Sequence, residues 1–325
     1  MIDAFGRTID YLRVGVTDRC NLRCIYCMPS NGVEWLFHDE VLSFEEILHI
    51  CTVAAGMGIS KIKVTGGEPL VRRGIIPFIA ALKKISGIKT VSITTNALLL
   101  GEYLDQLLDA GLDAINISLD TLDEKTFLRI TNNSDLVQVL GAIKKVLKTN
   151  LNIKINCVPL LGVNENDIIP LAAFAKDYNI AVRFIELMPL GFAACHKAIP
   201  FDSVFSTLKN HFGALCESQE SRGNGPAKYF TVEGFKGSIG FISALSHNFC
   251  STCNRMRLIG TGLLKPCLSS DISLDLKSIL RKKIIPGLSV DDALKNAFES
   301  ALILKPPSHT FAESVKSTNM FRIGG

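Results

Sequence analysis

Six of the ten cysteines in this 325-residue chain fall into two tight groups, Cys20, Cys24, Cys27 and Cys250, Cys253, Cys267. The first group is spaced C-x3-C-x2-C and the second C-x2-C-x13-C. A structural zinc ion or a fully ligated [4Fe–4S] cluster needs four protein ligands, whereas each group offers three. Each group therefore indicates a [4Fe–4S] cluster with one open iron, where a substrate or cosubstrate can bind.

Zinc remains the alternative at both groups. At the first it would need a distant His or Asp, and C-x3-C-x2-C is an uncommon spacing for zinc. At the second, His247 lies just before Cys250 and could complete the site. A disulfide framework is not expected in so large a chain. The four remaining cysteines stand among apolar neighbours, and we expect buried structural thiols at Cys51, Cys157, Cys195 and Cys216.

Two further patterns could bind ligands. In Thr65-Gly66-Gly67-Glu68-Pro69, glycines would let backbone approach a ligand, and the carboxylate could accept hydrogen bonds from an ammonium group. A plain turn is the alternative. Cations also recur on expected strands, where burial would call for an anionic partner; solvated surface charge is the alternative. These cations are Arg13, Lys61, Lys63, Lys154 and Arg183, with Arg255 and Arg257 following the second cysteine group.

The elements that must position these residues alternate along the first two-thirds of the chain. Helical patterns separate six β-rich runs, and the first helix has a Ser43 cap with Glu46 at its third position. The runs are Tyr11–Thr17, Ile62–Thr65, Thr90–Thr94, Ala114–Leu119, Ile153–Val158 and Ala181–Glu186. Six β/α units predict a parallel sheet curled into an incomplete, laterally open (β/α)6 TIM-like barrel, with its chemistry at the C-terminal strand ends.

The alternation of β-rich runs and helical patterns stops near residue 215. We expect residues 1–215 to form the barrel with the first cysteine group, and residues 216–325 to form a smaller α+β region with the second. Antiparallel strands are expected at Lys228–Val232 and Gly237–Ile242, and helices at Leu274–Arg281 and Ser289–Ser300. The chain ends in Gly324 and Gly325, and chain ends are usually frayed.

Composition limits the partners. The chain is 47% hydrophobic and 20% charged, with a net charge of +4, which suits a polyanionic small molecule at least as well as nucleic acid. No run of Lys or Arg marks a nucleic-acid surface, so we expect no nucleic acid. No apolar stretch is long enough for a membrane span, and the N-terminus lacks the apolar core of a signal peptide. We therefore expect no membrane partner and a cytoplasmic location.

The first cysteine loop, Cys20-Asn-Leu-Arg-Cys24-Ile-Tyr-Cys27, resembles the signature of the radical S-adenosylmethionine (SAM) superfamily. The resemblance implies that the open iron chelates the amino and carboxylate groups of SAM, and that reductive cleavage yields a 5′-deoxyadenosyl radical. Asp120, which follows Ser118 closely, could equally be a helix cap. The positions that match SAM contacts are Tyr26, Gly66, Gly67, Glu68, Ser118 and Met188.

Around the second group, Phe249-Cys-Ser-Thr-Cys-Asn-Arg-Met-Arg-Leu258 resembles the family of molybdenum cofactor biosynthesis protein A, the GTP 3′,8-cyclases. The resemblance spans nearly the whole chain and implies a second [4Fe–4S] cluster, a GTP substrate, no side-chain acid or base, and a Gly324-Gly325 tail that reaches the active site. Lys63 and Ala97 depart from the family's usual Arg and Gly. Lys63 keeps the charge without the bidentate geometry, and Ala97 would be strained if its turn needs a positive φ. The expected GTP-binding residues are Arg13, Lys61, Lys63, Thr94, Lys154, Arg183, Arg255, Met256 and Arg257.

The resemblance also implies partners. Cyclic pyranopterin monophosphate synthase would take the product, a flavodoxin or ferredoxin would donate electrons, and the chain would be a monomer or homodimer. One alternative is another radical SAM enzyme with an auxiliary cluster, of the peptide maturase type, although such enzymes usually carry more C-terminal cysteines. Another is a non-enzymatic iron–sulfur carrier or zinc scaffold, which would not need the Gly-Gly-Glu-Pro loop or the strand cations.

Overall fold

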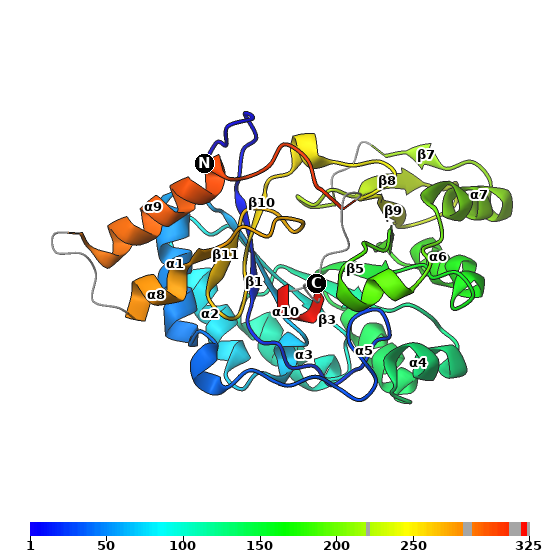
Figure 1. Cartoon of the computed structure of the whole chain (residues 1–325). Helices are drawn as coiled ribbons and strands as arrows, with labels where there is room; N and C mark the ends of the chain where they lie inside the picture. The colour runs from blue at the N-terminus through cyan, green and yellow to red at the C-terminus, as the bar shows by residue number, and fades with distance from the viewer. Residues whose placement is uncertain (219–221, 282–287, 312–319, 324–325) are drawn as a thin grey trace.

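The computed structural model describes all residues except 219–221, 282–287, 312–319 and 324–325 (Figure 1). Its strands are β1 Tyr11–Gly15, β2 Lys61–Thr65, β3 Thr90–Thr95, β4 Ala114–Ser118, β5 Asn152–Cys157, β6 Ala181–Ile185, β7 Cys216–Glu217, β8 Lys228–Thr231, β9 Ser238–Ile242, β10 Arg255–Leu258, β11 Leu263–Lys265 and β12 Leu274–Asp275. Its α-helices are α1 Phe44–Gly56, α2 Ile75–Lys84, α3 Leu100–Asp109, α4 Glu124–Thr131, α5 Leu136–Val146, α6 Ile168–Asp177, α7 Phe201–Phe212, α8 Leu276–Arg281, α9 Val290–Ile303 and α10 Met320–Ile323.

Strands β1 to β6 lie in sequence order, each parallel to the next. All six expected strands are therefore confirmed within two residues at each end. The helices between them cover the outer side of the sheet (Figure 1). The described strands form one open row that ends in β12 at one edge and β7 at the other, which confirms the incomplete barrel. No helix within the described ranges is long and apolar enough to cross a membrane.

The C-terminal strands extend this sheet at both edges. Strand β10 pairs parallel with β1, and β9 pairs parallel with β6. The expected antiparallel pairing of 228–232 with 237–242 is confirmed by β8 and β9. The sequence did not predict that these strands continue the barrel sheet, because their register depends on partners far away in the chain. The division of the chain at residue 215 stays a prediction.

Side chains alternate along each barrel strand. One set is apolar, belongs to the main hydrophobic core and includes Leu12, Val14, Ile62, Val64, Ile93, Ile115, Ile155 and Val182. The other set is polar and includes Arg13, Lys63, Ser92, Thr94, Asn116, Lys154 and Arg183. Because successive side chains of a strand point to opposite faces, the apolar set packs outward and the polar set faces the barrel interior. Buried parallel strands are usually apolar on both faces, so this interior is built to hold something polar.

Two local expectations concern helices and thiols. Ser43 accepts a hydrogen bond from the Glu46 backbone, and the Glu46 carboxylate accepts one from the Ser43 backbone, so the predicted capping box of α1 is confirmed.

Cys51 and Cys157 are buried as expected. The expectation was wrong for Cys195 and Cys216, which are exposed. Cys195 ends a short surface helix and Cys216 lies on the edge strand β7, so apolar neighbours in sequence did not bring burial.

Ala97 has a φ angle of 67°, in the left-handed region, although its side chain is fully buried. The sequence predicted strain at this turn, because Ala97 stands where glycine is usual in the resembling family, and the backbone angle confirms it. The turn is closed by hydrogen bonds from Ala97 N to Thr95 Oγ1 and from Leu98 N to the Asn96 side chain. A Cβ in this conformation costs about 1–2 kcal/mol.

Replacing Ala97 by Gly should therefore stabilise the fold. Relief of the strain, about 1–2 kcal/mol, is offset by about 0.4–1 kcal/mol of added freedom in the unfolded chain, so the free energy of unfolding should rise by roughly 0.5–1 kcal/mol. Guanidinium unfolding under anaerobic conditions measures this change. As a control, Ala54→Gly in the buried interior of α1 should destabilise by about 1 kcal/mol. Equal or lower stability of Ala97→Gly would contradict the strain.

Candidate active site

The first cysteine triplet lies on the loop that follows β1. The Cys27 backbone N–H donates to Cys24 O at 2.8 Å, which turns the loop back on itself. Burial, reinforced by neighbouring negative charge, raises the pKa of the Cys20 thiol to about 11 and that of Cys27 to about 12. Such thiols stay protonated at neutral pH unless a cation binds them, because thiolates need positive compensation in a buried site. Three such thiols on one short loop are the ligand type that an iron–sulfur cluster requires.

The Gly-Gly-Glu loop after β2 packs directly against the cysteine loop. A Cβ on Gly67 would lie 2.3 Å from Arg19 O, and one on Gly66 would lie 2.5 Å from Thr17 O. Backbone hydrogen bonds of 2.8 Å from Gly67 N to Thr17 O and from Glu68 N to Arg19 O join the two loops. The sequence predicted that these glycines allow close approach. The approach seen is to the cysteine loop, so any larger residue would displace that loop.

Glu68 is almost fully buried where β2 and β3 end. Its carboxylate accepts hydrogen bonds from Thr95 Oγ1 at 2.8 Å, Asn96 N at 2.7 Å and Leu70 N at 3.0 Å. Burial nevertheless raises its pKa to about 7. Asn96 in turn directs its amide at Cys20 Sγ, at 3.8 Å. Glu68 thus ties the third strand to the cysteine loop, and its expected contact with SAM stays a prediction.

Tyr26, between two of the cysteines, donates from its hydroxyl to Asp120 Oδ2 at 2.6 Å. Asp120 also accepts from Val158 N at 2.8 Å, so it joins the cysteine loop to the ends of β4 and β5. The helix-cap interpretation of Asp120 was wrong, because Asp123 caps α4. Of the other expected SAM contacts, Ser118 ends β4, and Met188 packs near Ile323 in a small apolar cluster.

The second triplet lies at the opposite end of the barrel. Register pairs Tyr11, the first residue of β1, with Arg255, the first residue of β10, so Cys253 lies beside the start of β1 and Cys20 beyond its end. Burial would raise the pKa of the Cys253 thiol, but the positive charges of Arg255 and Lys305 outweigh it and lower the pKa to about 7. This thiol is therefore prepared to bind as a thiolate.

A single zinc ion finds no support at either triplet. Within the described ranges, no group of three His, Cys, Asp or Glu side chains comes close enough to hold one metal ion. His247, the fourth ligand in the zinc alternative, packs edge-on against Phe201 and hydrogen-bonds to Ser246.

Between the two triplets, cations occupy the barrel interior. Register places Lys63, Arg13 and Arg257 side by side across β2, β1 and β10. Burial lowers the pKa of Lys63 well below its usual value, and the charges of Arg183, Arg13, Lys154 and Arg255 lower it further. Buried like charges this close favour the binding of an anion between them.

The neighbouring interior residues add polar groups at the same level. Arg183 donates twice to Asn156 Oδ1, at 2.9 and 2.6 Å, and Lys154 donates to Asn152 Oδ1 at 2.8 Å. The expected Thr94 hydroxyl accepts from the Asn116 amide at 3.5 Å. Lys61 differs from the expected set, because it forms an ion pair with Asp10 at 3.0 Å outside this group. The Met256 side chain is buried on the core face of β10.

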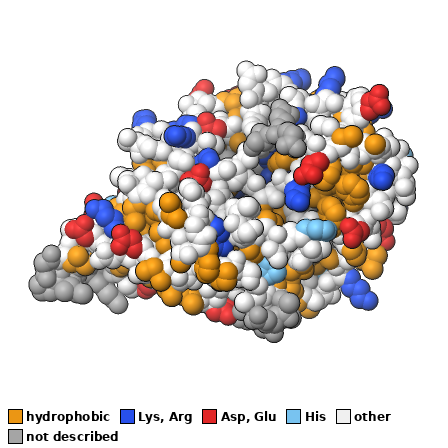
Figure 2. Space-filling view, turned by 90° about the horizontal axis from the view of Figure 1, so that it is seen from above, with side chains coloured by type: hydrophobic (Ala, Val, Ile, Leu, Met, Phe, Trp, Pro, Cys, Tyr) orange, Lys and Arg blue, Asp and Glu red, His pale blue; other side chains and the backbone are white. Residues whose placement is uncertain are grey.

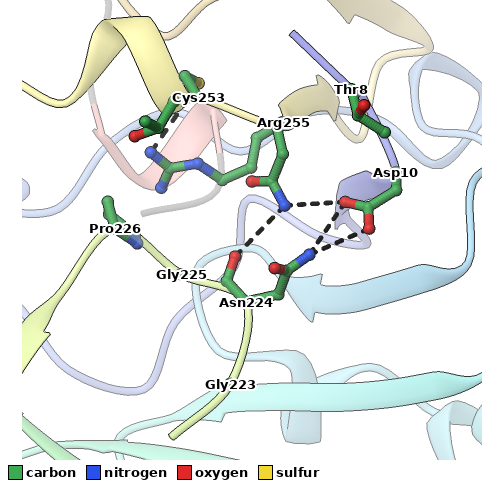
Figure 3. Close-up of a pocket in the computed structure, with 10 residues that line it drawn as sticks. Thr8, Asp10, Gly223, Asn224, Gly225, Pro226, Cys253 and Arg255 are labelled. Atoms are coloured by element: carbon green, nitrogen blue, oxygen red, sulfur yellow. Dashed lines mark hydrogen bonds between the residues drawn. The ribbon is translucent and has the colours of Figure 1, made fainter. Parts of the chain in front are cut away.

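A cavity of about 390 Å³ opens at the end of the barrel where β1 begins, lined by Thr8, Asp10, 223–226 and 252–255 (Figure 3). Asp10 accepts hydrogen bonds from the side chains of Asn224 at 3.0 Å and Asn254 at 2.8 Å, and so ties the 223–226 loop to the second triplet (Figure 3). Figure 2 looks onto this side, where Lys and Arg lie in small separate groups. The concentrated positive charge is inside the barrel.

The C-terminal helix α10 lies between the two triplets. Phe321 and Ile323 are buried, and the Phe321 backbone N–H faces the Cys27 thiol. Arg257 Nη1 donates to Ile323 O at 3.5 Å. The predicted entry of the tail concerns Gly324 and Gly325, which lie outside the described residues. The helix before them already bridges the first triplet and the interior cations.

Sequence reasoning missed three groups of the site. Asp10 and Asn156 are ordinary polar residues in the sequence. Only the structure shows that Asp10 holds the cavity loop through Asn224 and Asn254, and that Asn156 holds Arg183. Lys305 follows α9 far from any motif, yet its ammonium reaches Cys253 Sγ at 3.7 Å. Local sequence offered no signal for it, since the contact joins residues about 50 positions apart.

Comparisons with known proteins agree with this geometry. The Radical SAM superfamily model matches residues 14–175, and the Molybdenum Cofactor Synthesis C model matches residues 180–311. The fold is similar to that of Streptococcus suis SuiB, with TM-score 0.65 and 16% identity over 97% of this chain and 75% of the SuiB chain in its complex with the precursor peptide SuiA. Fold and cysteine loop together define a radical SAM enzyme.

Full-length relatives narrow the assignment. The chain is 42% identical to the GTP 3′,8-cyclase of Petrotoga mobilis, over 100% of both chains. It is 44% identical to that of Heliobacterium modesticaldum, over 95% of this chain and 94% of the relative. It is 40% identical to that of Clostridium perfringens over the full length of both. The chain belongs to the GTP 3′,8-cyclase family.

The two triplets should carry separable clusters. We expect about eight irons per chain after anaerobic reconstitution, and Cys253→Ala should lose about half of them while Cys24→Ala loses the other half. Only Cys24→Ala should abolish reductive SAM cleavage. Iron analysis and 5′-deoxyadenosine release measure both effects, with Cys216→Ala, an exposed thiol, as the control. Full iron content and activity in Cys253→Ala would show that the second triplet holds no cluster.

Proposed function

We propose that this radical SAM enzyme converts GTP to (8S)-3′,8-cyclo-7,8-dihydroguanosine 5′-triphosphate, joining C3′ of the ribose to C8 of guanine. This is the first step of molybdenum cofactor biosynthesis. The observation that carries the proposal is the buried group of cations between two cysteine triplets. It occurs in a chain 42% identical over its full length to a curated GTP 3′,8-cyclase.

The charge of the interior suits a triphosphate. Arg13 repels Lys63 and Arg257 on the two adjacent strands, and a triphosphate would offset this positive charge. Lys63 provides charge without the bidentate geometry of an arginine, so phosphate geometry would depend mainly on Arg13, Arg183 and the two arginines of β10. In the proposed site, Thr94 adds a hydroxyl to this set.

The remaining residues position and enclose the cofactors. Cys20, Cys24 and Cys27 would hold one cluster and Cys250, Cys253 and Cys267 the other. When bound, SAM and the reduced first cluster supply a 5′-deoxyadenosyl radical, and the second cluster supplies an open iron for the purine. Tyr26, bonded to Asp120, and Glu68 N, bonded to Arg19 O, fix the first cysteine loop. Burial excludes water from this side, which protects a radical reaction. No side chain is assigned as acid or base.

The proposed cellular context follows the same family. The product would pass to cyclic pyranopterin monophosphate synthase, and electrons would come from a flavodoxin or ferredoxin. We place the enzyme in the cytoplasm, as a monomer or homodimer. The peptide maturase alternative draws support from the fold likeness to SuiB, but that likeness has only 16% sequence identity. The full-length relatives favour the cyclase.

A direct assay tests the proposal. Anaerobically reconstituted enzyme with dithionite and SAM should release 5′-deoxyadenosine faster when GTP is added, together with one cyclised nucleotide. ATP should not replace GTP, and Cys24→Ala serves as the inactive control. If GTP neither stimulates SAM cleavage nor gives a cyclised product, the chain is another radical SAM enzyme.

Triphosphate binding should take up a proton through Lys154. Burial, reinforced by Arg183 and Arg222, lowers the pKa of Lys154 to about 7, so at pH 8 the free enzyme holds it mostly neutral. An adjacent triphosphate favours the charged form and raises this pKa, so binding should gain close to one proton at pH 8 and weaken as the pH rises above about 7. Calorimetry in two buffers of different ionisation enthalpy measures the uptake.

The matched variants are Lys154→Met and Arg257→Ala. Lys154→Met should reduce the proton uptake, whereas Arg257→Ala should keep it while weakening GTP binding by about tenfold to a hundredfold, the value of a charged hydrogen bond. Iron content should be unchanged in both. Uptake in Lys154→Met equal to that of the unmodified enzyme would remove Lys154 from the phosphate site.

Deleting Gly324 and Gly325 should leave folding and both clusters unchanged but sharply lower cyclisation. The preceding helix lies against Cys27 and Arg257, and a Gly-Gly end with a terminal carboxylate can enter a narrow, basic channel. Single-turnover assays should compare 5′-deoxyadenosine with cyclised product in both proteins. If truncation changes neither yield, these two glycines have no part in the reaction.

A further inference from the structure

The segment from Lys305 to Phe311 wraps the second cysteine triplet. Lys305 is 2% exposed, one of the most deeply buried charged residues described. Its Nζ donates to Arg255 O at 2.7 Å, to Pro266 O at 2.8 Å and to Cys253 Sγ at 3.7 Å. These three contacts use the three hydrogens of the ammonium group, so its position is fixed from three sides.

The charge of Lys305 needs an anion. Two of its three acceptors are neutral carbonyls, and no described carboxylate forms an ion pair with it. Asp3, whose partner Arg7 also contacts Pro306 O next to Lys305, is already paired with Arg7 at 2.6 Å. A buried ammonium without an anion is costly, and the third acceptor, Cys253 Sγ, is the one that can carry negative charge. The cysteine triplet is therefore the counter-ion of Lys305.

Other groups hold this arrangement in place. Arg7 donates to Cys250 O at 2.8 Å and to Pro306 O at 2.8 Å, which fastens the wrapping segment to the triplet. The His309 backbone N–H faces the Cys250 thiol, and Ser269 Oγ lies 3.4 Å from Cys267 Sγ. Each of the three cysteines thus has a polar neighbour. Two positive charges face Cys253 Sγ, since Arg255 Nη2 also donates to it at 4.0 Å, but Lys305 is the closer and the more deeply buried of the two.

We propose that Lys305 is a positioning residue that directs a fixed positive charge and a hydrogen bond at the ligand Cys253 and so raises the reduction potential of the cluster on the second triplet. The inference rests on the proposed cluster there. Each added electron makes a cluster more negative, so a fixed positive charge and a hydrogen bond at a ligand sulfur stabilise the reduced form more than the oxidised form. Lys305 acts on this site without touching the substrate.

The test is an EPR-monitored redox titration of the second cluster alone, in the Cys24→Ala background. In that background Lys305→Met and Lys305→Gln should each disfavour the reduced cluster by about tenfold, a shift of about 59 mV to more negative potential for a one-electron couple. Lys295→Met, on the exposed side of α9 and paired with Asp292, should leave the potential unchanged. Lys305→Gln keeps a donor for the carbonyls but removes the charge.

Each outcome decides the proposal. An unchanged potential in Lys305→Gln would overturn it, because hydrogen bonds to the carbonyls would then be sufficient. If both variants lose the second cluster, hydrogen exchange of the iron-free proteins decides between the two roles. Protection of residues 253–267 equal to that of the unmodified iron-free chain supports the proposal. Lost protection shows that the lysine is merely structural. Absence of iron at the second triplet with Lys305 intact would instead refute the cluster assignment and the proposed function.

Discussion

Positive charge is concentrated in the barrel interior, where Lys63, Arg13 and Arg257 lie side by side on three hydrogen-bonded strands. In water such charges would separate, but here the backbone ladder fixes their spacing, so their repulsion cannot be relieved by movement of the strands. The fold must offset this cost with the apolar core on the outer face of the same strands. The site and the core therefore depend on one another through the alternation of side chains, and a ligand that neutralises the interior would also stabilise the barrel.

The first cysteine loop is held in place by close backbone packing and hydrogen bonds, not by the interior charges. Gly66 and Gly67 leave no space between the second strand end and the cysteine loop, and Glu68 joins the third strand end through Thr95 and Asn96. Ala97 follows in a strained left-handed turn, and the neighbouring Asn96 amide faces Cys20. Strained backbone persists where surrounding contacts determine it fully, and here those contacts hold a cluster ligand. The strain is thus a cost of positioning Asn96.

The sequence predicted most of the barrel and the chemistry of its two ends. The six strands followed from local patterns, the cysteine triplets from spacing, and the strain at Ala97 from a single substitution. Long-range register could not be predicted, which is why the places of β9 and β10, the Lys61–Asp10 ion pair and the Lys305 contact were missed. Burial of Cys195 and Cys216 was also predicted wrongly, because apolar neighbours do not decide which side of a surface element faces water.

The pairing of β1 with β10 has a consequence for synthesis of the chain. Tyr11 leaves the ribosome before its partner Arg255, which follows roughly 240 residues later. At about 5–20 residues per second, one edge of β1 waits for tens of seconds without its neighbour. Exposed strand edges recruit other chains, so this interval is the period in which the nascent protein is most prone to aggregate. The cysteine loop next to β1 emerges soon after that strand, whereas the second triplet is complete only about 240 residues after the first. Cluster insertion at the two ends of the barrel is therefore separated in time by the order of the chain itself.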